Sequence, residues 1–313
     1  MGVFDKGTIL GFTENVSQDL IDENCSRLVQ ILTSSITDLS KKNAIISKGI
    51  QVVPINEFAT GAITPISSLD VFLVIKSPQI ELNTVKVVKN KFKSFWERLK
   101  FAWKKSRIKK KRKRRNKNIT EQTTLNAQLK GKYDINDLCL DLVNTISNYI
   151  TPLSIVSSTN AVVSITGDDF SFPVNVYPAI KKENTYSVYN KILNKFFEYN
   201  FTERFENLKE MASGKEDKVL NLIKIYNMLY FNLYNKALYQ PFVESLIYNL
   251  PDNIFESDDI YEVFIRSINF LNNARWQDFV SILDKTKPMF KDERLQFSLF
   301  DTLDFIKNVK NNL

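Results

Sequence analysis

Residues 55–75 read INEFATGAITPISSLDVFLVI and end in the continuous apolar run Val71–Ile75. An apolar run of this length that follows turn residues is typical of a strand buried on both faces. Ser68 and Asp70 stand two residues apart at its start, so their side chains project from the same face of the strand. The segment therefore predicts a central strand with a polar pair at its beginning.

A second group of strands is predicted further along the chain. Apolar residues favour strands at Ala161–Ile165 and Phe170–Val176, joined by a hairpin turn, and Pro178 is expected to end the second strand. Asn175 lies on the polar side of that second strand. Three polar side chains can therefore converge, one from this strand and two from the central strand.

Helical periodicity covers most of the remaining sequence. It predicts helices over residues 21–40, 135–150, 186–199, 218–233, 241–248, 258–271, 276–283 and 297–309. A mixed half followed by a helical half predicts an α+β protein. We expect a core at 1–183, with a basic helical insertion at about 84–120, and a helical domain at 184–313, with a cleft between the two.

Composition excludes several classes of protein. The chain has 313 residues, 43% hydrophobic and 25% charged, which is typical of a globular protein. It has no histidine, which excludes His-based triads, imidazole bases and most catalytic zinc sites, and its two cysteines do not make a disulfide framework. No apolar run approaches the roughly 18 residues of a membrane span, and the first residues lack a signal-peptide layout. We therefore expect a cytoplasmic protein.

One segment makes an otherwise acidic protein basic. Residues 86–117 hold 17 Lys and Arg and one acid, whereas the rest of the chain holds 26 basic and 34 acidic residues. Apolar residues recur in the segment at helical spacing, which predicts an amphipathic helix that runs into a polybasic tip. These apolar residues are Phe92, Phe95, Trp96, Leu99 and Trp103.

Three interpretations of the basic segment are open. It is a solvated helical insertion that packs on its own domain, or it binds nucleic acid, RNA in preference to DNA, in a strongly salt-dependent way. The third interpretation, ranked below these, is binding to an anionic membrane surface. The candidate nucleic-acid contacts are Lys104, Lys105, Arg107, Lys109, Lys110, Lys111, Arg112, Lys113, Arg114 and Arg115.

Four segments resemble blocks of the DNA polymerase β-like nucleotidyltransferases, in the oligoadenylate-synthetase-like and cyclic GMP-AMP synthase-like branch that includes the bacterial CD-NTases. In that family a Gly-Ser pair precedes an Asp-x-Asp strand, and a third Asp stands in a later strand before a Val/Tyr-Pro-Ala stretch. The similar segments here are residues 55–75, FSFPVNVYPAI at 170–180, NLIKIYNML at 221–229 and PFVESLIYNLPDNIF at 241–255. The resemblance covers nearly all of the chain outside the basic insertion.

The resemblance implies a polymerase β-like core and a set of site residues. In the family three carboxylates hold two Mg²⁺ ions for nucleotidyl transfer, and a lysine contacts the triphosphate. The metal-binding positions correspond here to Ser68, Asp70 and Asn175, and the nucleotide-binding positions to Asn56, Thr60 and Lys224.

The sequence differs from the family pattern at the residues expected to bind metal ions and phosphates. Only Asp70 keeps a carboxylate, since Ser68 and Asn175 replace the other two acids, and the formal charge of the metal ligands falls from −3 to −1. Ile55 and Asn56 replace the Gly-Ser pair. We therefore expect Mg²⁺ only in an active form, with Asp70 a weak ligand, and no cofactor otherwise.

Two functions follow from the resemblance. The first is a pseudo-nucleotidyltransferase, catalytically dead or impaired, that binds nucleic acid or nucleotide as a sensor or regulatory subunit in a nucleotide-signalling antiviral defence system, with a possible protein partner. The alternative is an active metal-dependent enzyme that joins NTPs into linear or cyclic oligonucleotides when RNA or DNA activates it.

Several other residues have both a structural and a functional interpretation. Asp168 and Asp169 are substitute metal ligands or, in preference, turn formers. Lys224 is a nucleotide ligand or a surface lysine whose stem packs on apolar neighbours. Glu244 is expected to be structural, and the tyrosines at 226, 230 and 234 are expected to pack in the core rather than stack on bases.

Overall fold

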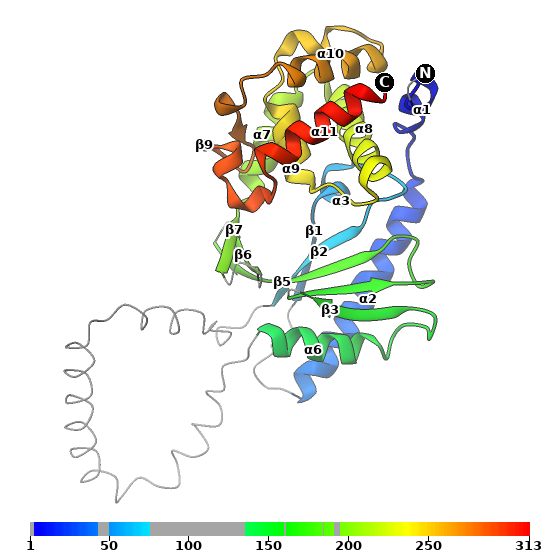
Figure 1. Cartoon of the computed structure of the whole chain (residues 1–313). Coiled ribbons are helices and arrows are strands. Elements are labelled where there is room, and N and C mark those ends of the chain that lie inside the picture. Colours follow the sequence, from blue (N-terminus) through cyan, green and yellow to red (C-terminus); the bar gives the residue numbers. More distant parts are fainter. Residues whose placement is uncertain (1–2, 43–49, 76–134, 160, 184, 191–194) are drawn as a thin grey trace, which may run out of the picture.

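The computed structural model describes residues 3–42, 50–75, 135–159, 161–183, 185–190 and 195–313 (Figure 1). The basic segment, with its expected helix and its candidate nucleic-acid contacts, lies outside these residues. Within these ranges, none of the helices combines the length and the hydropathy needed to cross a membrane.

The strands of the first half form a seven-stranded mixed sheet in the described part of the chain. The spatial order is β1 (Ile50–Pro54), β2 (Leu69–Ile75), β5 (Val174–Lys182), β4 (Val162–Thr166) and β3 (Ile155–Thr159), and β5 also pairs with β6 (Thr185–Asn190), which pairs with β7 (Lys195–Tyr199). β2 and β5 run parallel, and the other pairs are antiparallel. β2 lies between β1 and β5, as predicted for a central strand.

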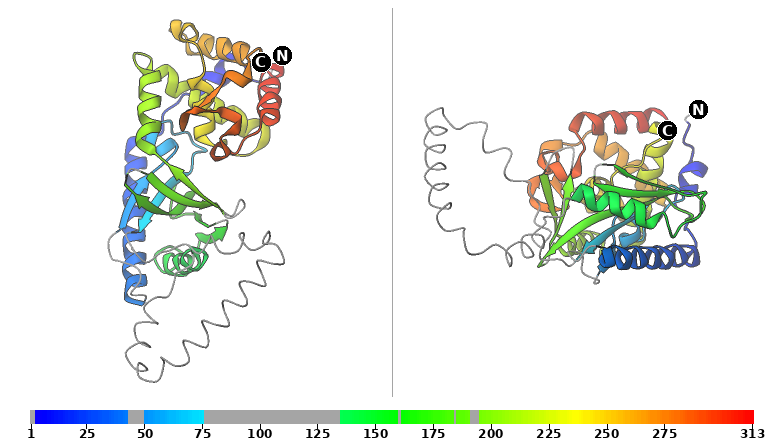
Figure 2. Two further views of the ribbon diagram at one scale, coloured as in Figure 1. Left: turned by 90° about the vertical axis from the view of Figure 1, so that its left-hand side faces the viewer. Right: turned by 90° about the horizontal axis from the view of Figure 1, so that it is seen from below.

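The two faces of the sheet have different partners. Two helices, α2 (Gln18–Lys42) and α6 (Ile135–Ile146), pack under one face (Figure 2). Leu69, Val71 and Leu73 of β2 belong to the core that these helices share with the sheet. Because side chains alternate along a strand, Asp70 and Phe72 point to the opposite face, toward the helical half.

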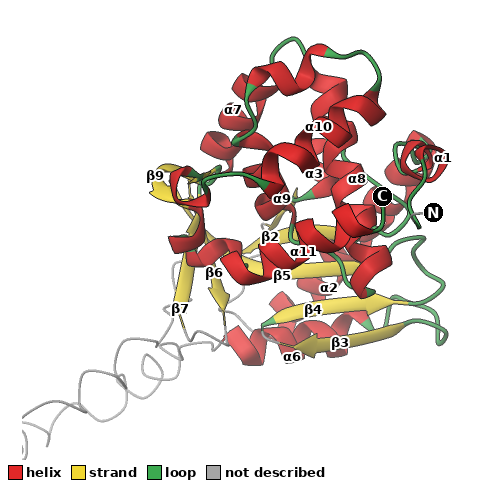
Figure 3. Ribbon diagram, turned by 45° about the horizontal axis from the view of Figure 1, so that its top comes forward, coloured by secondary structure: helices red, strands yellow, loops and turns green. Residues whose placement is uncertain are grey.

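The second half of the chain forms a helical lobe above the sheet (Figure 3). Its main elements are α7 (Phe201–Ala212), α8 (Glu216–Tyr234), α9 (Gln240–Tyr248), α10 (Ile260–Asn272), α11 (Leu299–Asn311) and the small hairpin of β8 (Val280–Ser281) and β9 (Asp284–Pro288). Helices α8 to α11 confirm the corresponding sequence predictions. A mixed sheet followed by this lobe confirms the α+β prediction.

The first helix, α1 (Lys6–Gly11), packs on the helical lobe rather than on the sheet (Figures 1 and 3). Phe4 and Ile9 are part of the buried core of that lobe. The backbone N–H of Phe4 donates to the carbonyl oxygen of Asn312 at 2.9 Å. The lobe is therefore built from both ends of the described chain.

The helix predicted over residues 186–199 is wrong, because β6 and β7 occupy the two ends of that range. Tyr186 pairs with Tyr199, and Val188 pairs with Phe197, across the antiparallel ladder. These pairs bring apolar side chains together on one face of a hairpin, and aromatic and β-branched residues favour such pairing. The apolar spacing that suggested a helix is thus satisfied by cross-strand contacts.

Two further predictions are corrected. The segment 276–283 is not a helix but a short 3₁₀ turn, Trp276–Asp278, followed by β8. Pro178 does not end the second strand, because β5 continues to Lys182. On the side away from β2, pairing with β4 stops at Val176 and pairing with β6 starts at Ala179, so the proline lies in a gap between two ladders where its missing N–H costs little.

Candidate functional site

Asp70 is the centre of a hydrogen-bonded cluster at the start of β2. Its Oδ1 accepts from Ser68 Oγ at 2.7 Å and from Asn175 Nδ2 at 2.9 Å, and its Oδ2 accepts from Asn56 Nδ2 at 2.7 Å. Asn175 is held in turn by Ser164, whose Oγ donates to Asn175 Oδ1 at 2.8 Å. The three side chains that the strand pattern brings together therefore meet at one carboxylate.

Backbone pairing explains why these residues meet. Asp70 stands opposite Asn175 in the parallel register of β2 and β5, and Asn175 stands opposite Ser164 in the register of β4 and β5. Ser68 precedes Asp70 by two residues and lies on the same side. The geometry of the cluster is thus set by three neighbouring strands.

Asn56 reaches the cluster from the loop between β1 and the short helix α3 (Glu57–Thr60). Its φ of 55° lies in a region that favours glycine, and a tight turn held in this conformation stores strain. The backbone N–H of Ile55 donates to the carbonyl oxygen of Asp70 at 2.9 Å, which ties this loop to β2. Asn56 makes no side-chain cap on α3, because its amide is bound to Asp70.

Burial and hydrogen bonding act in opposite directions on Asp70. The residue is 6% exposed, and this burial raises the pKa of its carboxyl group above the ordinary value. The hydrogen bonds from Asn175, Ser68 and Asn56 favour the charged form and offset part of that rise. Protein donors therefore take much of the hydrogen-bonding capacity that a cation would use.

Glu57 is a second acid at this site, which the sequence analysis did not single out. It is 8% exposed and lines the same cavity as Ser68 and Asp70. Burial, followed by the nearby charge of Asp70, raises the pKa of Glu57 to about 8. The sequence signal for Glu57 was its position directly after Asn56. Asn56 binds Asp70, so the next residue, at the start of α3, also lies close to Asp70.

Two cavities adjoin on this face of the sheet, and Asp70 lines the polar one. The polar cavity has a volume of about 220 Å³, and its lining includes Ser68, Asp70 and Asn175. The aromatic cavity has a volume of about 290 Å³, and its lining comes from β2, β4, β5, β6, β7, the loop after β1 and the helical lobe. Residues common to both linings are Asn56, Tyr177 and Tyr239.

Thr60 and Lys224 do not line these two cavities. The Oγ1 of Thr60 accepts from Gln240 Nε2 at 2.7 Å, which links α3 to α9. The Nζ of Lys224 donates to Asn15 Oδ1 at 2.5 Å, and Lys224 is only 3% exposed. The structure therefore brings Asn56, of the three nucleotide-binding candidates, into contact with Asp70.

The residues present do not fit a pair of magnesium ions. Asp70 and Glu57 are the acids that line the polar cavity, and Asp70 already accepts three hydrogen bonds. Among the described residues, no group of three or more His, Cys, Asp or Glu side chains is arranged to hold a metal ion. Neutral Ser and Asn oxygens replace little of the charge that Mg²⁺ requires to give up its water.

Asp169 and Glu244 have structural contacts. The Oδ2 of Asp169 accepts from the backbone N–H and the hydroxyl of Thr151, both at 2.7 Å, and its Oδ1 pairs with Arg27 of α2. Burial acts to raise the pKa of Asp169, but hydrogen bonds from Ser154, Thr151 and Arg27 outweigh it and lower the pKa to about 2. Glu244 forms a buried bidentate ion pair with Arg204, described below.

The tyrosines of α8 pack inside the helical lobe. The Tyr226 hydroxyl lies 2.8 Å from Ser267 Oγ, and the residue is fully buried. The rings of Tyr230 and Tyr234 lie 4.7 Å apart, next to Phe305 of α11. Their contacts are those expected of core residues.

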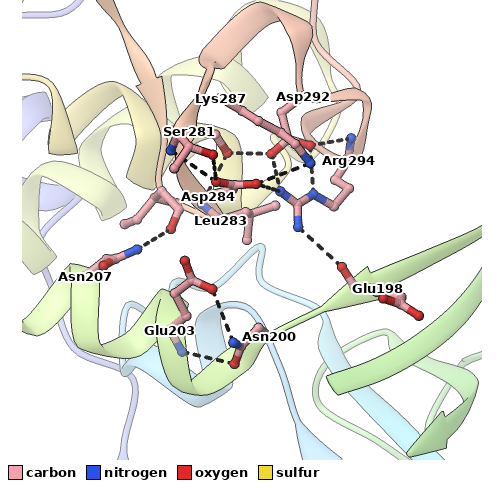
Figure 4. Close-up of polar contacts among 12 residues, drawn as sticks. Glu198, Asn200, Glu203, Asn207, Ser281, Leu283, Asp284, Lys287, Asp292 and Arg294 are labelled. Atoms are coloured by element: carbon pink, nitrogen blue, oxygen red, sulfur yellow. Dashed lines mark hydrogen bonds and ion pairs between the residues drawn. The ribbon is translucent and has the colours of Figure 1, made fainter. Parts of the chain in front are cut away.

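Polar contacts join the sheet to the helical lobe around the β8–β9 hairpin (Figure 4). Arg294 donates from Nε and Nη2 to the two carboxylate oxygens of Asp292 at 2.7 and 2.6 Å. Its Nη1 donates to the backbone carbonyl of Glu198 in β7 at 3.3 Å. Asn207 of α7 donates to the carbonyl oxygen of Ile282 at 2.9 Å. Asn207 thus links α7 to the turn of the β8–β9 hairpin, and Arg294 links the segment after the hairpin to β7.

Several solved structures share this fold. The chain is similar to the Elizabethkingia meningoseptica CdnE cyclic dinucleotide synthase with GTP and Apcpp, with a TM-score of 0.62, 14% identity and 98% of each chain covered. It is similar to E. coli MS115-1 CdnC with ATP, with a TM-score of 0.59, 11% identity and 99% and 91% of the two chains covered. For the Vibrio cholerae DncV cyclic AMP-GMP synthase with a linear intermediate, the TM-score is 0.57, the identity 8% and the coverage 96% and 86%.

No protein-family model matches the chain, and no curated sequence matches it. The likeness is therefore one of fold, and it extends over nearly the whole chain. The mixed sheet, the helical lobe and the order of the elements agree with the resemblance carried by the four sequence blocks. The chain has the nucleotidyltransferase fold of the bacterial CD-NTases.

Proposed function

We propose that this protein is a non-catalytic relative of the CD-NTases that binds a nucleotide or nucleic acid and does not join NTPs. The observation that carries the proposal is the saturation of Asp70 by Asn56, Ser68 and Asn175. In a two-metal mechanism, carboxylates at such positions remain free to ligate the ions. Here two of the corresponding positions donate hydrogen bonds to the third.

Charge supports the same proposal. Two magnesium ions in a buried site need several negative oxygens, since each ion must exchange water for ligands. Asp70 supplies one carboxylate, and Glu57, with its pKa of about 8, is mostly protonated at neutral pH. The donors around Asp70 stabilise one negative charge and leave no excess to attract a second ion.

We propose that the basic segment binds the macromolecular partner, and that this partner is RNA in preference to DNA. The cations of residues 104–115 suit a phosphate backbone, and such binding depends strongly on salt. A regulatory role in nucleotide-signalling defence would add a protein partner, and one similar structure is a CdnC:HORMA-deltaN complex. In this role the protein binds a ligand and transmits the signal through contacts with its protein partner.

The test is a reaction with labelled NTPs, Mg²⁺ or Mn²⁺ and a panel of RNAs and DNAs. We expect no pyrophosphate and no oligonucleotide product from the wild-type chain. The matched control is Asp70→Asn, which removes the one carboxylate among the three metal-binding positions and should give the same background. Product from the wild type that Asp70→Asn abolishes would establish the alternative, an active enzyme that makes linear or cyclic oligonucleotides.

A further inference from the structure

Two buried amide side chains at the polar cavity have unfilled hydrogen-bonding atoms. Asn227 of α8 is 4% exposed, and neither its Nδ2 nor its Oδ1 has a partner among the described residues. Gln240 of α9 is 1% exposed, and its Oε1 likewise lacks a partner in the described part of the chain. Both residues line the polar cavity. Because a buried polar group without a hydrogen-bond partner is unfavourable, these atoms indicate a partner that enters the cavity.

The charge of the polar cavity disfavours an anionic partner. No Lys or Arg is among the described residues that line it, and the carboxylic acids in its lining are Asp70 and Glu57. Lys224, three residues before Asn227 on α8, directs its Nζ to Asn15 instead. A triphosphate placed here without cations would face Asp70 and have no side chain to neutralise it.

The hydrogen-bonding groups of the cavity are mixed. Asn227 offers a donor and an acceptor, and Gln240 offers an acceptor. Glu57 lies in the same lining. A set that contains both donors and acceptors suits the polar edge of a nucleobase, which also presents both.

Aromatic side chains adjoin these polar groups. Tyr177 and Tyr239 line both cavities, and Phe72 and Phe201 continue the aromatic wall of the second one. Aromatic side chains favour the binding of a base, because the base can stack on the ring. An apolar wall beside a mixed polar edge is the arrangement that recognises a planar heterocycle rather than a phosphate.

We propose, on the basis of the function proposed above, that these adjoining cavities bind an uncharged nucleoside moiety without a metal ion. The base lies against Tyr177 and Tyr239, and its polar edge bonds to Asn227 and Gln240. The position that holds phosphates and metal ions in a two-metal transferase then serves to read a base.

Calorimetric titration of the full chain tests this proposal, with adenosine, guanosine, cytidine and uridine as probes, each with EDTA or Mg²⁺. The corresponding triphosphates form the second arm. We expect at least one nucleoside to bind with the same affinity in EDTA and in Mg²⁺. Its triphosphate should bind no more tightly in Mg²⁺ than the nucleoside does. Absence of binding by all four nucleosides overturns the proposal, as does a triphosphate that binds tenfold more tightly than its nucleoside only with Mg²⁺.

Variants of α8 locate the site. Asn227→Leu replaces the unpaired amide by an apolar group of similar size, and should weaken nucleoside binding about tenfold or more without lowering the melting temperature. Asn232→Leu makes the same change at an exposed position of α8 and should bind like the wild type. Wild-type affinity in Asn227→Leu overturns the proposal. If that variant does not fold, Asn227→Ala gives the same comparison.

This outcome is separable from that of the proposed function. Pyrophosphate release overturns the non-catalytic function whatever the nucleosides do. Tight Mg²⁺-dependent triphosphate binding without turnover leaves that function intact and overturns only the nucleoside site.

Discussion

Arg204 and Glu244 form a bidentate ion pair in which Nε and Nη2 each donate to a carboxylate oxygen at 2.7 Å, and both side chains are almost completely buried. The pair joins α7 to α9 behind the aromatic cavity, which Arg204 helps to line. A buried pair of this kind leaves a strongly unfavourable charge when one partner is removed.

Glu244→Gln should therefore lower the free energy of unfolding by about 3 kcal/mol or more, because the Arg204 charge loses its counterion in the interior. Urea denaturation measures this change. The control is Glu210→Gln, which removes an exposed partner of Lys285 and should change stability little. Equal effects of the two substitutions would contradict the structural role of the buried pair.

Restoring the two missing acids should create metal dependence. In the double variant Ser68→Asp/Asn175→Asp, three carboxylates lie close together in a buried site and repel one another. The melting temperature in EDTA should therefore fall below that of the wild type. Mn²⁺ or Mg²⁺ should then raise it, because the ions bind only the folded state. The wild type should show no such response in thermal denaturation, and a comparable response there would argue for an intact metal site.

Stability should fall as the pH rises from about 5 to 8. The folded-state pKa of Glu57 is raised to about 8, so between its ordinary value and pH 8 the native state binds a proton that the unfolded state has lost. The chain has no histidine, so no imidazole titrates in this window. Urea denaturation across this range should show a weaker pH dependence for Glu57→Gln than for the wild type, and identical slopes would exclude Glu57 as the cause.

Gly167 should not tolerate a side chain. Its φ is 125°, and an added Cβ would lie 2.5 Å from the carbonyl oxygen of Leu153, so Gly167→Ala should cost about 1–3 kcal/mol. Gly11→Ala adds the same atom at the end of α1, where nothing lies within 4 Å, and should leave stability unchanged or slightly higher. The melting temperatures of the two variants separate steric conflict from a general effect of alanine.

Deletion of residues 104–117 should abolish binding to RNA and DNA and flatten its salt dependence, since most of the dense positive charge lies there. Filter binding across a range of salt concentrations measures both effects. Unchanged affinity would favour the solvated insertion instead, and co-sedimentation of the intact chain with anionic liposomes would favour the membrane surface.

The sequence was most informative where a pattern depends on one element. The apolar run at Val71–Ile75 and the two-residue period of the strands were enough to bring Ser68, Asp70 and Asn175 together, because parallel neighbours fix which residues face each other. Helices α8 to α11 were equally accessible, since each shows a sustained apolar face.

What the sequence missed depends on contacts between elements. The sequence predicts a helix where the β6–β7 hairpin lies, because apolar residues that pair across two strands also fit helical spacing over a short range. The strand Ile155–Thr159 was not predicted, since three of its five residues are exposed at the edge of the sheet. Glu57 carries no pattern of its own, and its burial beside Asp70 appears only when α3 is placed over β2.

The contact between Phe4 and Asn312 has a consequence for how the molecule forms. The first residues of the helical lobe find their partners only after the ribosome has made α11, so this lobe is completed last. The sheet and its two covering helices lie between these ends in sequence and share a separate core, so they are free to condense earlier during synthesis.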